Sequence, residues 1–140
     1  MTQTNVPAGD KESLLIVDDE EINRAILANI FSDQYRILEA GDGQAGLAAI
    51  LAHASSLSAV LLDVIMPWMN GIQVLRALHQ QGLTRVIPVF LITADGADSV
   101  MREAYELGVM DVILKPVVPY MVHRRVNSVV ELFRARRCTM

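Results

Sequence analysis

Short apolar runs alternate with helix-like segments along almost the whole sequence, and this alternation restricts the fold more than any other feature. The runs occupy residues 14–17, 35–39, 59–62, 86–93 and 112–114, and the second is polar enough for the edge of a sheet. After each run, apolar residues recur at helical spacing, in residues 20–31, 42–53, 71–81, 98–107 and 119–137. Five strands that alternate with five helices predict one α/β domain with a parallel sheet and right-handed crossovers.

Two of these helices carry expectations that can be checked residue by residue. Asp98 or Ser99 is expected to cap the fourth helix, and Gly108 is expected to end it. The first helix is expected from apolar residues that recur at helical spacing, which are Ile22, Ala25, Ile26 and Ile30.

Length and composition limit the class of protein. The chain has 140 residues, of which 52% are hydrophobic, so it can bury a dense core as one domain. Its apolar runs are far too short to cross a bilayer, and residues 1–12 lack the apolar segment of a signal peptide. We therefore expect a polar lead-in at residues 1–12, a domain at residues 13–137, and a short C-terminal end at residues 138–140.

Cysteine content and charge predict where the protein works. The lone Cys138 cannot form an internal disulfide, which agrees with a reducing cytoplasm. The formal net charge of -4 offers no general attraction for nucleic acid. We expect a cytoplasmic protein that binds no membrane and has no direct contact with nucleic acid.

A carboxylate directly follows the most apolar run. Residues 59–62 are apolar on both faces of the predicted strand, and Asp63 ends the run. Met66-Pro67 and Asn70-Gly71 then require a sharp turn. Asp63 either caps this turn or binds a ligand, because open parallel sheets bind ligands at the carboxyl ends of their strands.

Other polar residues end other runs and so reach the same edge of the sheet. Asp18 and Asp19 follow the first strand, Thr93 ends the fourth, and Lys115 follows the fifth. If the polar edge strand lies beside the first strand, the carboxylates of Asp18, Asp19 and Asp63 meet where the chain order reverses.

Such a group of side chains predicts phosphoryl chemistry. Three neighbouring carboxylates stay ionised at neutral pH only with a compensating cation. Mg²⁺ meets this need, since it takes one or two carboxylates together with water and phosphate oxygens. Lys115 supplies a charge for an anion, and Thr93 supplies a hydroxyl donor. A carboxylate facing the crevice can then act as a nucleophile toward a phosphoryl group.

The motifs that carry these residues are LLIVDDEE, LLDVIMPWMNG, LITA and LKP. In this order and spacing they resemble the receiver domain of bacterial two-component response regulators, over roughly residues 13–137. The resemblance implies a CheY-like, flavodoxin-like fold, with a doubly wound sheet in the strand order 2-1-3-4-5. It also implies a signalling module that catalyses its own aspartyl phosphorylation and dephosphorylation, and is not otherwise an enzyme.

The resemblance also implies roles for individual residues. Asp63 would be the phosphoacceptor, Lys115 would pair with the phosphoryl group, and Thr93 would be the switch hydroxyl. The Lys115-Pro116 bond would be cis. The implied Mg²⁺ ligands are the carboxylates of Asp18, Asp19 and Asp63 and the backbone carbonyl of Ile65, with Asp18 acting largely through water.

Partners follow from the same resemblance. A histidine kinase or phosphotransfer protein would donate the phosphoryl group, and an output domain beyond Met140 would produce the response. The last helix is basic on its wet side and longer than a crossover needs, so a partner surface or a homodimer through the fourth and last helices is expected. Acids such as Glu103 or Glu106 would meet the basic residues, which are Arg124, Arg125, Arg134, Arg136 and Arg137.

The sequence departs from the family at the position three residues before Lys115. Val112 stands where receivers usually carry a Tyr or Phe that turns inward on activation, and a valine cannot make that movement. Tyr105 could substitute, or it is a partly buried ring on the fourth helix. Ile65 and Asp95 would flank the path of the hydrolytic water, and Ile65 cannot hold a water by hydrogen bonding.

Two other classes fit the sequence less well. A phosphatase of the haloacid dehalogenase type would carry Asp-x-Asp after its first strand, and this chain does not. A flavodoxin-like cofactor binder would carry a Gly-rich phosphate loop there. This chain instead has Asp-Asp-Glu-Glu, which repels phosphate in the absence of a metal.

Overall fold

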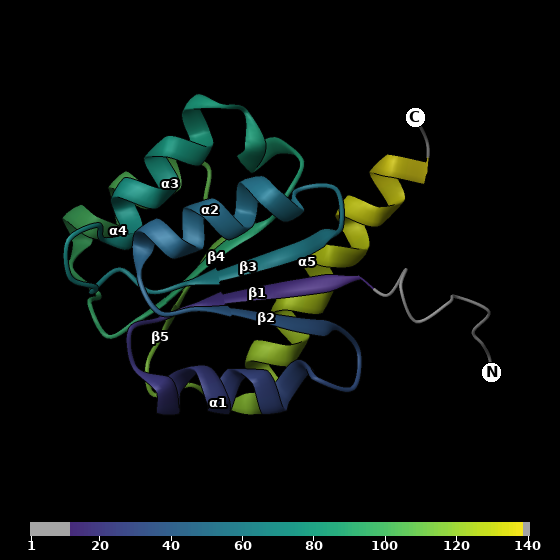
Figure 1. The fold of residues 1–140 in the computed structure, drawn as a ribbon, viewed down its shortest axis with the longest axis horizontal. Helices are drawn as coiled ribbons and strands as arrows, with labels where there is room; N and C mark the ends of the chain where they lie inside the picture. Colours follow the sequence, from purple (N-terminus) through teal and green to yellow (C-terminus); the bar gives the residue numbers. More distant parts are fainter. Residues whose placement is uncertain (1–11, 139–140) are drawn as a thin grey trace.

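The computed structural model describes residues 12–138, which form one sheet covered by helices on both faces (Figure 1). The strands are β1 (Ser13–Val17), β2 (Arg36–Ala40), β3 (Leu57–Leu62), β4 (Val89–Thr93) and β5 (Asp111–Leu114). The helices are α1 (Glu21–Phe31), α2 (Gly43–His53), α3 (Gly71–Gln80), α4 (Asp98–Glu106) and α5 (Pro119–Cys138), with a short 3-10 helix η2 (Leu83–Arg85) before β4. The predicted lead-in and C-terminal end fall almost wholly outside this range, as do the side chains of Arg137 and Cys138.

The sheet is parallel and has the predicted order, β2-β1-β3-β4-β5. β1 pairs with β2 on one side and with β3 on the other, so the chain order reverses at β1. The weak second strand is at the edge, as its polar sequence predicted. The predicted fold class is confirmed.

Alternate residues of the central strands enter two separate cores. Leu14 and Ile16 of β1 pack on the side of α1 and α5, while Leu15 and Val17 pack on the side of α2, α3 and α4. Figure 1 shows these helices on opposite sides of the sheet. Because side chains alternate along a strand, a strand buried on both faces must be apolar throughout, as β1 and β3 are.

The predicted first helix is confirmed as α1, but the apolar residues that indicated it do not form its buried face. Ile22 and Ile26 are 71% and 45% exposed, whereas Leu27 and Phe31 are buried. The helix carries two overlapping apolar stripes, and the one with the larger aromatic side chain faces the sheet. Phe31 stacks on His123 of α5 and meets the ring of Tyr35 edge-on, contacts that the other stripe would not provide.

The start of α4 also differs from the prediction. The N-cap residue is Ala97, which has no capping side chain, so neither Asp98 nor Ser99 caps the helix. Instead, Asp95 Oδ1 accepts a hydrogen bond from the Ala97 amide at 3.1 Å, which fixes the loop just before the helix. The predicted end is confirmed, because Gly108 takes a positive φ of 95° directly after α4.

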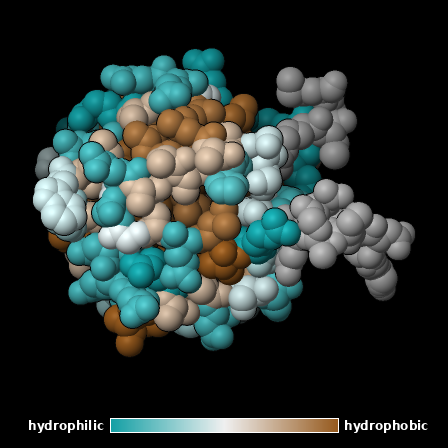
Figure 2. Space-filling model, viewed as in Figure 1, coloured by the Kyte–Doolittle hydropathy of each residue, from teal (hydrophilic) through white to brown (hydrophobic). Residues whose placement is uncertain are grey.

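The surface is mixed in character. The face seen in Figure 2 shows apolar residues over α2 among hydrophilic ones. Trp68, in the loop after β3, is 88% exposed with a positive φ of 65°. Within residues 12–138, none of the helices has the length and apolar character needed to span a membrane.

Candidate functional site

Two of the acidic residues extend the strand ladder by one step. The Asp18 amide donates to the Ala40 carbonyl at 3.1 Å, and the Asp63 amide donates to the Val17 carbonyl at 2.9 Å. Both residues therefore lie directly beyond neighbouring strands, at the point where the chain order reverses. This placement is what the apolar runs before them predicted.

The close approach of α3 holds the backbone of Asp63 in place. A Cβ on Gly71, the first residue of α3, would lie 2.2 Å from the Asp63 carbonyl oxygen. Only glycine fits here, because any side chain would overlap the backbone of the candidate phosphoacceptor. Asn70 caps the helix through a reciprocal capping box with Gln73, which fixes the far end of the loop.

Lys115 lies between the two buried carboxylates. Its Nζ donates to Asp18 Oδ2 at 2.8 Å and to Asp63 Oδ2 at 2.9 Å. The predicted cis bond between Lys115 and Pro116 is confirmed, and the Lys115 amide donates to the Thr93 carbonyl at 2.9 Å. The Lys115 ammonium thus joins the ends of β1, β3 and β5, and the Lys115 backbone amide joins the end of β4.

The electrostatics of this ammonium group have two opposing causes. Burial lowers the pKa of Lys115, while the hydrogen bonds and charges of Asp18 and Asp63 raise it. The net effect is a pKa above the ordinary 10.5, so the group is charged at neutral pH. Lys115 is therefore a cation that balances the charges of two buried carboxylates.

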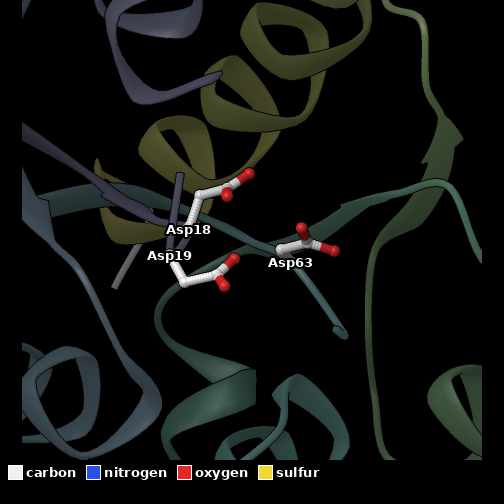
Figure 3. Close-up of side chains that lie close together, drawn as sticks. All are labelled: Asp18, Asp19 and Asp63. Carbon is white, nitrogen blue, oxygen red and sulfur yellow. The ribbon is translucent and has the colours of Figure 1, made fainter. Parts of the chain in front are cut away.

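Asp18, Asp19 and Asp63 meet as the sequence predicted. Each offers one carboxylate oxygen, and these oxygens lie within 4.8 Å of one another. Figure 3 shows the three side chains lying close together, Asp18 and Asp19 after β1 and Asp63 after β3. A set made only of oxygen donors fits Mg²⁺, and the exposure of Asp19 leaves a side open to water and phosphate. The Ile65 amide donates to Asp63 Oδ1 at 3.2 Å. The Ile65 carbonyl stays a predicted ligand.

Thr93 is the last residue of β4, directly before a residue that lines the crevice. It is fully buried, and its Oγ1 accepts a hydrogen bond from the Asp95 amide at 3.2 Å. The next residue, Ala94, does line the crevice.

The crevice has a volume of about 610 Å³ and includes residues that were not predicted. Asp19, Asp63, Ile65 and Lys115 line it. Four residues of the β1–α1 turn and α1 also line it, namely Glu20, Asn23, Ile26 and Leu27. The position of Asn23, four residues after Asp19 and within the first turn of α1, was the available signal.

The position of the usual switch aromatic is filled by a buried valine. Val112 packs in the core on the α4 side of the sheet. Tyr105 is half-exposed, and its hydroxyl donates to Asp111 Oδ1 at 3.4 Å. Tyr105 thus lies on the surface of α4 and does not occupy the place of the missing ring.

The fold and the crevice together define a class of protein domain. It is a doubly wound sheet in which three carboxylates and a lysine meet where the strand order reverses, in a set that fits Mg²⁺. A sequence model described as "Response regulator receiver domain" matches residues 14–127. The chain therefore belongs to the response regulator receiver domain family. The predicted class, a receiver domain of two-component signalling, is confirmed.

Individual relatives agree with this assignment. The chain is 38% identical over 116 residues to response regulator PleD of Caulobacter vibrioides, covering 82% of this chain and 25% of PleD. It is 36% identical over 116 residues to transcriptional regulatory protein SrrA of Staphylococcus aureus, covering 82% and 46% respectively. The chain thus spans less than half of the length of either protein.

Solved structures show the same architecture. A chain in the CheX-CheY-BeF3-Mg²⁺ complex from Borrelia burgdorferi matches with 30% identity and a TM-score of 0.78, over 84% of this chain and 88% of that one. A CheY-like receiver domain protein from Methanospirillum hungatei matches with a TM-score of 0.81 and 20% identity, over 90% and 98%, which supports the fold alone.

Proposed function

We propose that Asp63 accepts a phosphoryl group from a phosphohistidine donor, with Mg²⁺ held by Asp18, Asp19, Asp63 and the Ile65 carbonyl. The observation that carries the proposal is the meeting of three carboxylates and the Lys115 ammonium at the switch point. A bound Mg²⁺ would neutralise charge on the transferring phosphoryl oxygens.

The residues of the chain have distinct parts in this reaction. An Asp63 carboxylate oxygen forms the new bond to phosphorus, while the bond between phosphorus and the donor nitrogen breaks and the electron pair stays with the imidazole. Lys115 is already 2.9 Å from Asp63, so its ammonium can pass from the carboxylate to the phosphoryl group with little displacement. Thr93 would follow by a movement of the 94–97 loop.

The phosphoryl donor, the output domain and a homodimer are further parts of the proposal. A histidine kinase or phosphotransfer protein in the cytoplasm would supply the phosphoryl group, and a further domain would give the output, as the greater length of PleD and SrrA supports. A homodimer through α4 and α5 would have fewer charges available than the sequence predicts. Arg125 already pairs with Asp111, and Glu103 already pairs with Arg76.

Intact-protein mass spectrometry with acetyl phosphate and Mg²⁺ tests the proposal. The parent should gain one phosphoryl mass, and should lose that gain when the metal is chelated. Asp63→Asn should gain nothing, whereas the control Asp33→Asn, an exposed acid in the α1–β2 turn, should behave as the parent. Equal labelling of Asp63→Asn and parent would refute the proposal.

A further inference from the structure

The guanidinium of Arg24 connects α1 to β2 and to the acidic turn, which is the turn from Asp18 to Glu20 between β1 and α1. Its Nη1 donates to the backbone carbonyl of Asp18 at 2.6 Å, and its Nε donates to Glu39 Oε1 at 3.0 Å. A Cβ on Gly41 would lie 3.5 Å from the same Nη1, so the group also packs against the turn after β2. The Arg24 side chain is only 17% exposed, so it is largely buried and is fixed in position by these contacts.

The carbonyl that Arg24 holds belongs to the peptide bond between Asp18 and Asp19. Fixing this peptide restricts the backbone rotation after Asp18 and the rotation before Asp19, and both rotations aim the metal-binding carboxylates. Two further hydrogen bonds hold the same turn, from the Asp18 amide to Ala40 and from the Glu20 amide to Asp18 Oδ1 at 2.9 Å. With Arg24 present, the amide, the side chain and the carbonyl of Asp18 each have a partner.

We propose that Arg24 is a positioning residue for the Mg²⁺ site, which it preorganises through the Asp18 carbonyl. This proposal rests on the proposed function, because it assumes that Asp18 and Asp19 bind the metal. The contact of Arg24 with the turn is a hydrogen bond to a backbone carbonyl, so the proposed contribution is to the geometry of the turn. Groups that orient metal ligands from behind commonly change metal affinity 10–100-fold when they are lost.

A purely structural role is the competing explanation, since the ion pair with Glu39 also ties α1 to the edge strand. The two explanations differ in what Glu39 contributes. If Arg24 acts only as a tie, removing Glu39 should have the same effect as removing Arg24. If Arg24 positions the acidic turn, Glu39→Gln leaves the bond to the Asp18 carbonyl in place and leaves the metal site intact.

Isothermal titration of the full chain with Mg²⁺ separates the two, with the apo melting temperature as the second readout. Arg24→Met should weaken Mg²⁺ binding about tenfold. Arg24→Lys keeps the charge but replaces two nitrogens held in a planar fork by a single nitrogen, so it should also weaken binding. Glu39→Gln should stay within about twofold of the parent, as should Arg102→Met, which removes an exposed charge from α4 on the opposite face of the sheet.

Phosphorylation by acetyl phosphate gives a third readout. Arg24→Met should need more Mg²⁺ for half-maximal rate and should approach the parent rate at saturating Mg²⁺. Unchanged Mg²⁺ affinity in Arg24→Lys and Arg24→Met, with lowered melting temperatures, would overturn the proposal. If Arg24→Met does not fold, Arg24→Lys decides. Failure of the parent to bind Mg²⁺ would instead count against the proposed function itself.

Discussion

Replacing Gly71 by alanine should damage the candidate site through the backbone of Asp63. The added Cβ would lie 2.2 Å from the Asp63 carbonyl oxygen and 2.9 Å from the Val64 Cα. Ordinary contact requires a separation greater by about 1 Å, so α3 or the end of β3 must shift by that amount. Neither is a flexible side chain, and overpacking of this kind costs about 1–3 kcal/mol.

Thermal unfolding and Mg²⁺ titration measure the two consequences. A loss of this size should lower the melting temperature by about 4–12 °C. The shift of Asp63 should weaken Mg²⁺ binding as well. Gly82→Ala is the matched control, because Gly82 has a φ of 73° with nothing within 4 Å of the added Cβ. It should cost about 1 kcal/mol from backbone strain alone and leave Mg²⁺ binding unchanged.

The reasoning is refuted if Gly71→Ala melts within about 2 °C of the parent and binds Mg²⁺ equally well. That result would mean that the close approach of α3 does not position Asp63. A fall in stability with unchanged Mg²⁺ affinity would refute only the link from packing to the site.

Three further predictions concern charge and water. Lys115→Met should destabilise the metal-free chain by about 3–5 kcal/mol in urea unfolding, because it leaves two buried carboxylates unpaired; added Mg²⁺ should recover much of this, and an unchanged midpoint would contradict the account. Ile65→Asn should speed loss of phosphate from the phosphorylated chain, since an amide can hold the hydrolytic water where isoleucine cannot; a slower or equal decay would count against it. Burial raises the pKa of the Tyr35 phenol, with Arg134 opposing this, so its contribution to stability is complete below about pH 10 and is lost as pH rises through the folded pKa. Tyr35→Phe should show a shallower fall in urea midpoint above pH 10, and parallel curves would contradict this.

The meeting of the polar residues at the strand ends was predictable from the sequence, because it depends on a single rule of parallel sheets. Parallel strands deliver their carboxyl ends to one edge, so residues that follow apolar runs must meet there. Asp18, Asp63 and Lys115 could therefore be placed together before any geometry was known. Their distances and the bridging position of the lysine could not, because these depend on side-chain rotamers and on the close approach of α3.

Helix orientation was less predictable. In α1 two apolar stripes compete, and the choice between them depends on the packing of Phe31 against His123 and Tyr35, residues distant in sequence. The contact of Arg24 with the Asp18 carbonyl was missed for a similar reason. It depends on the rotation of α1 and on Glu39 from another strand, and no local pattern encodes either.

Chemical mapping of the phosphorylated residue shows whether Asp63 is the phosphoacceptor. Borohydride reduces an aspartyl phosphate to homoserine, which peptide mass spectrometry locates to a single position. After treatment with acetyl phosphate and Mg²⁺, we expect homoserine at position 63 and unmodified aspartate at positions 18 and 19. Homoserine at position 18 or 19 would contradict the assignment of Asp63 as the phosphoacceptor. A gain of one phosphoryl mass with no homoserine at position 18, 19 or 63 would contradict it as well.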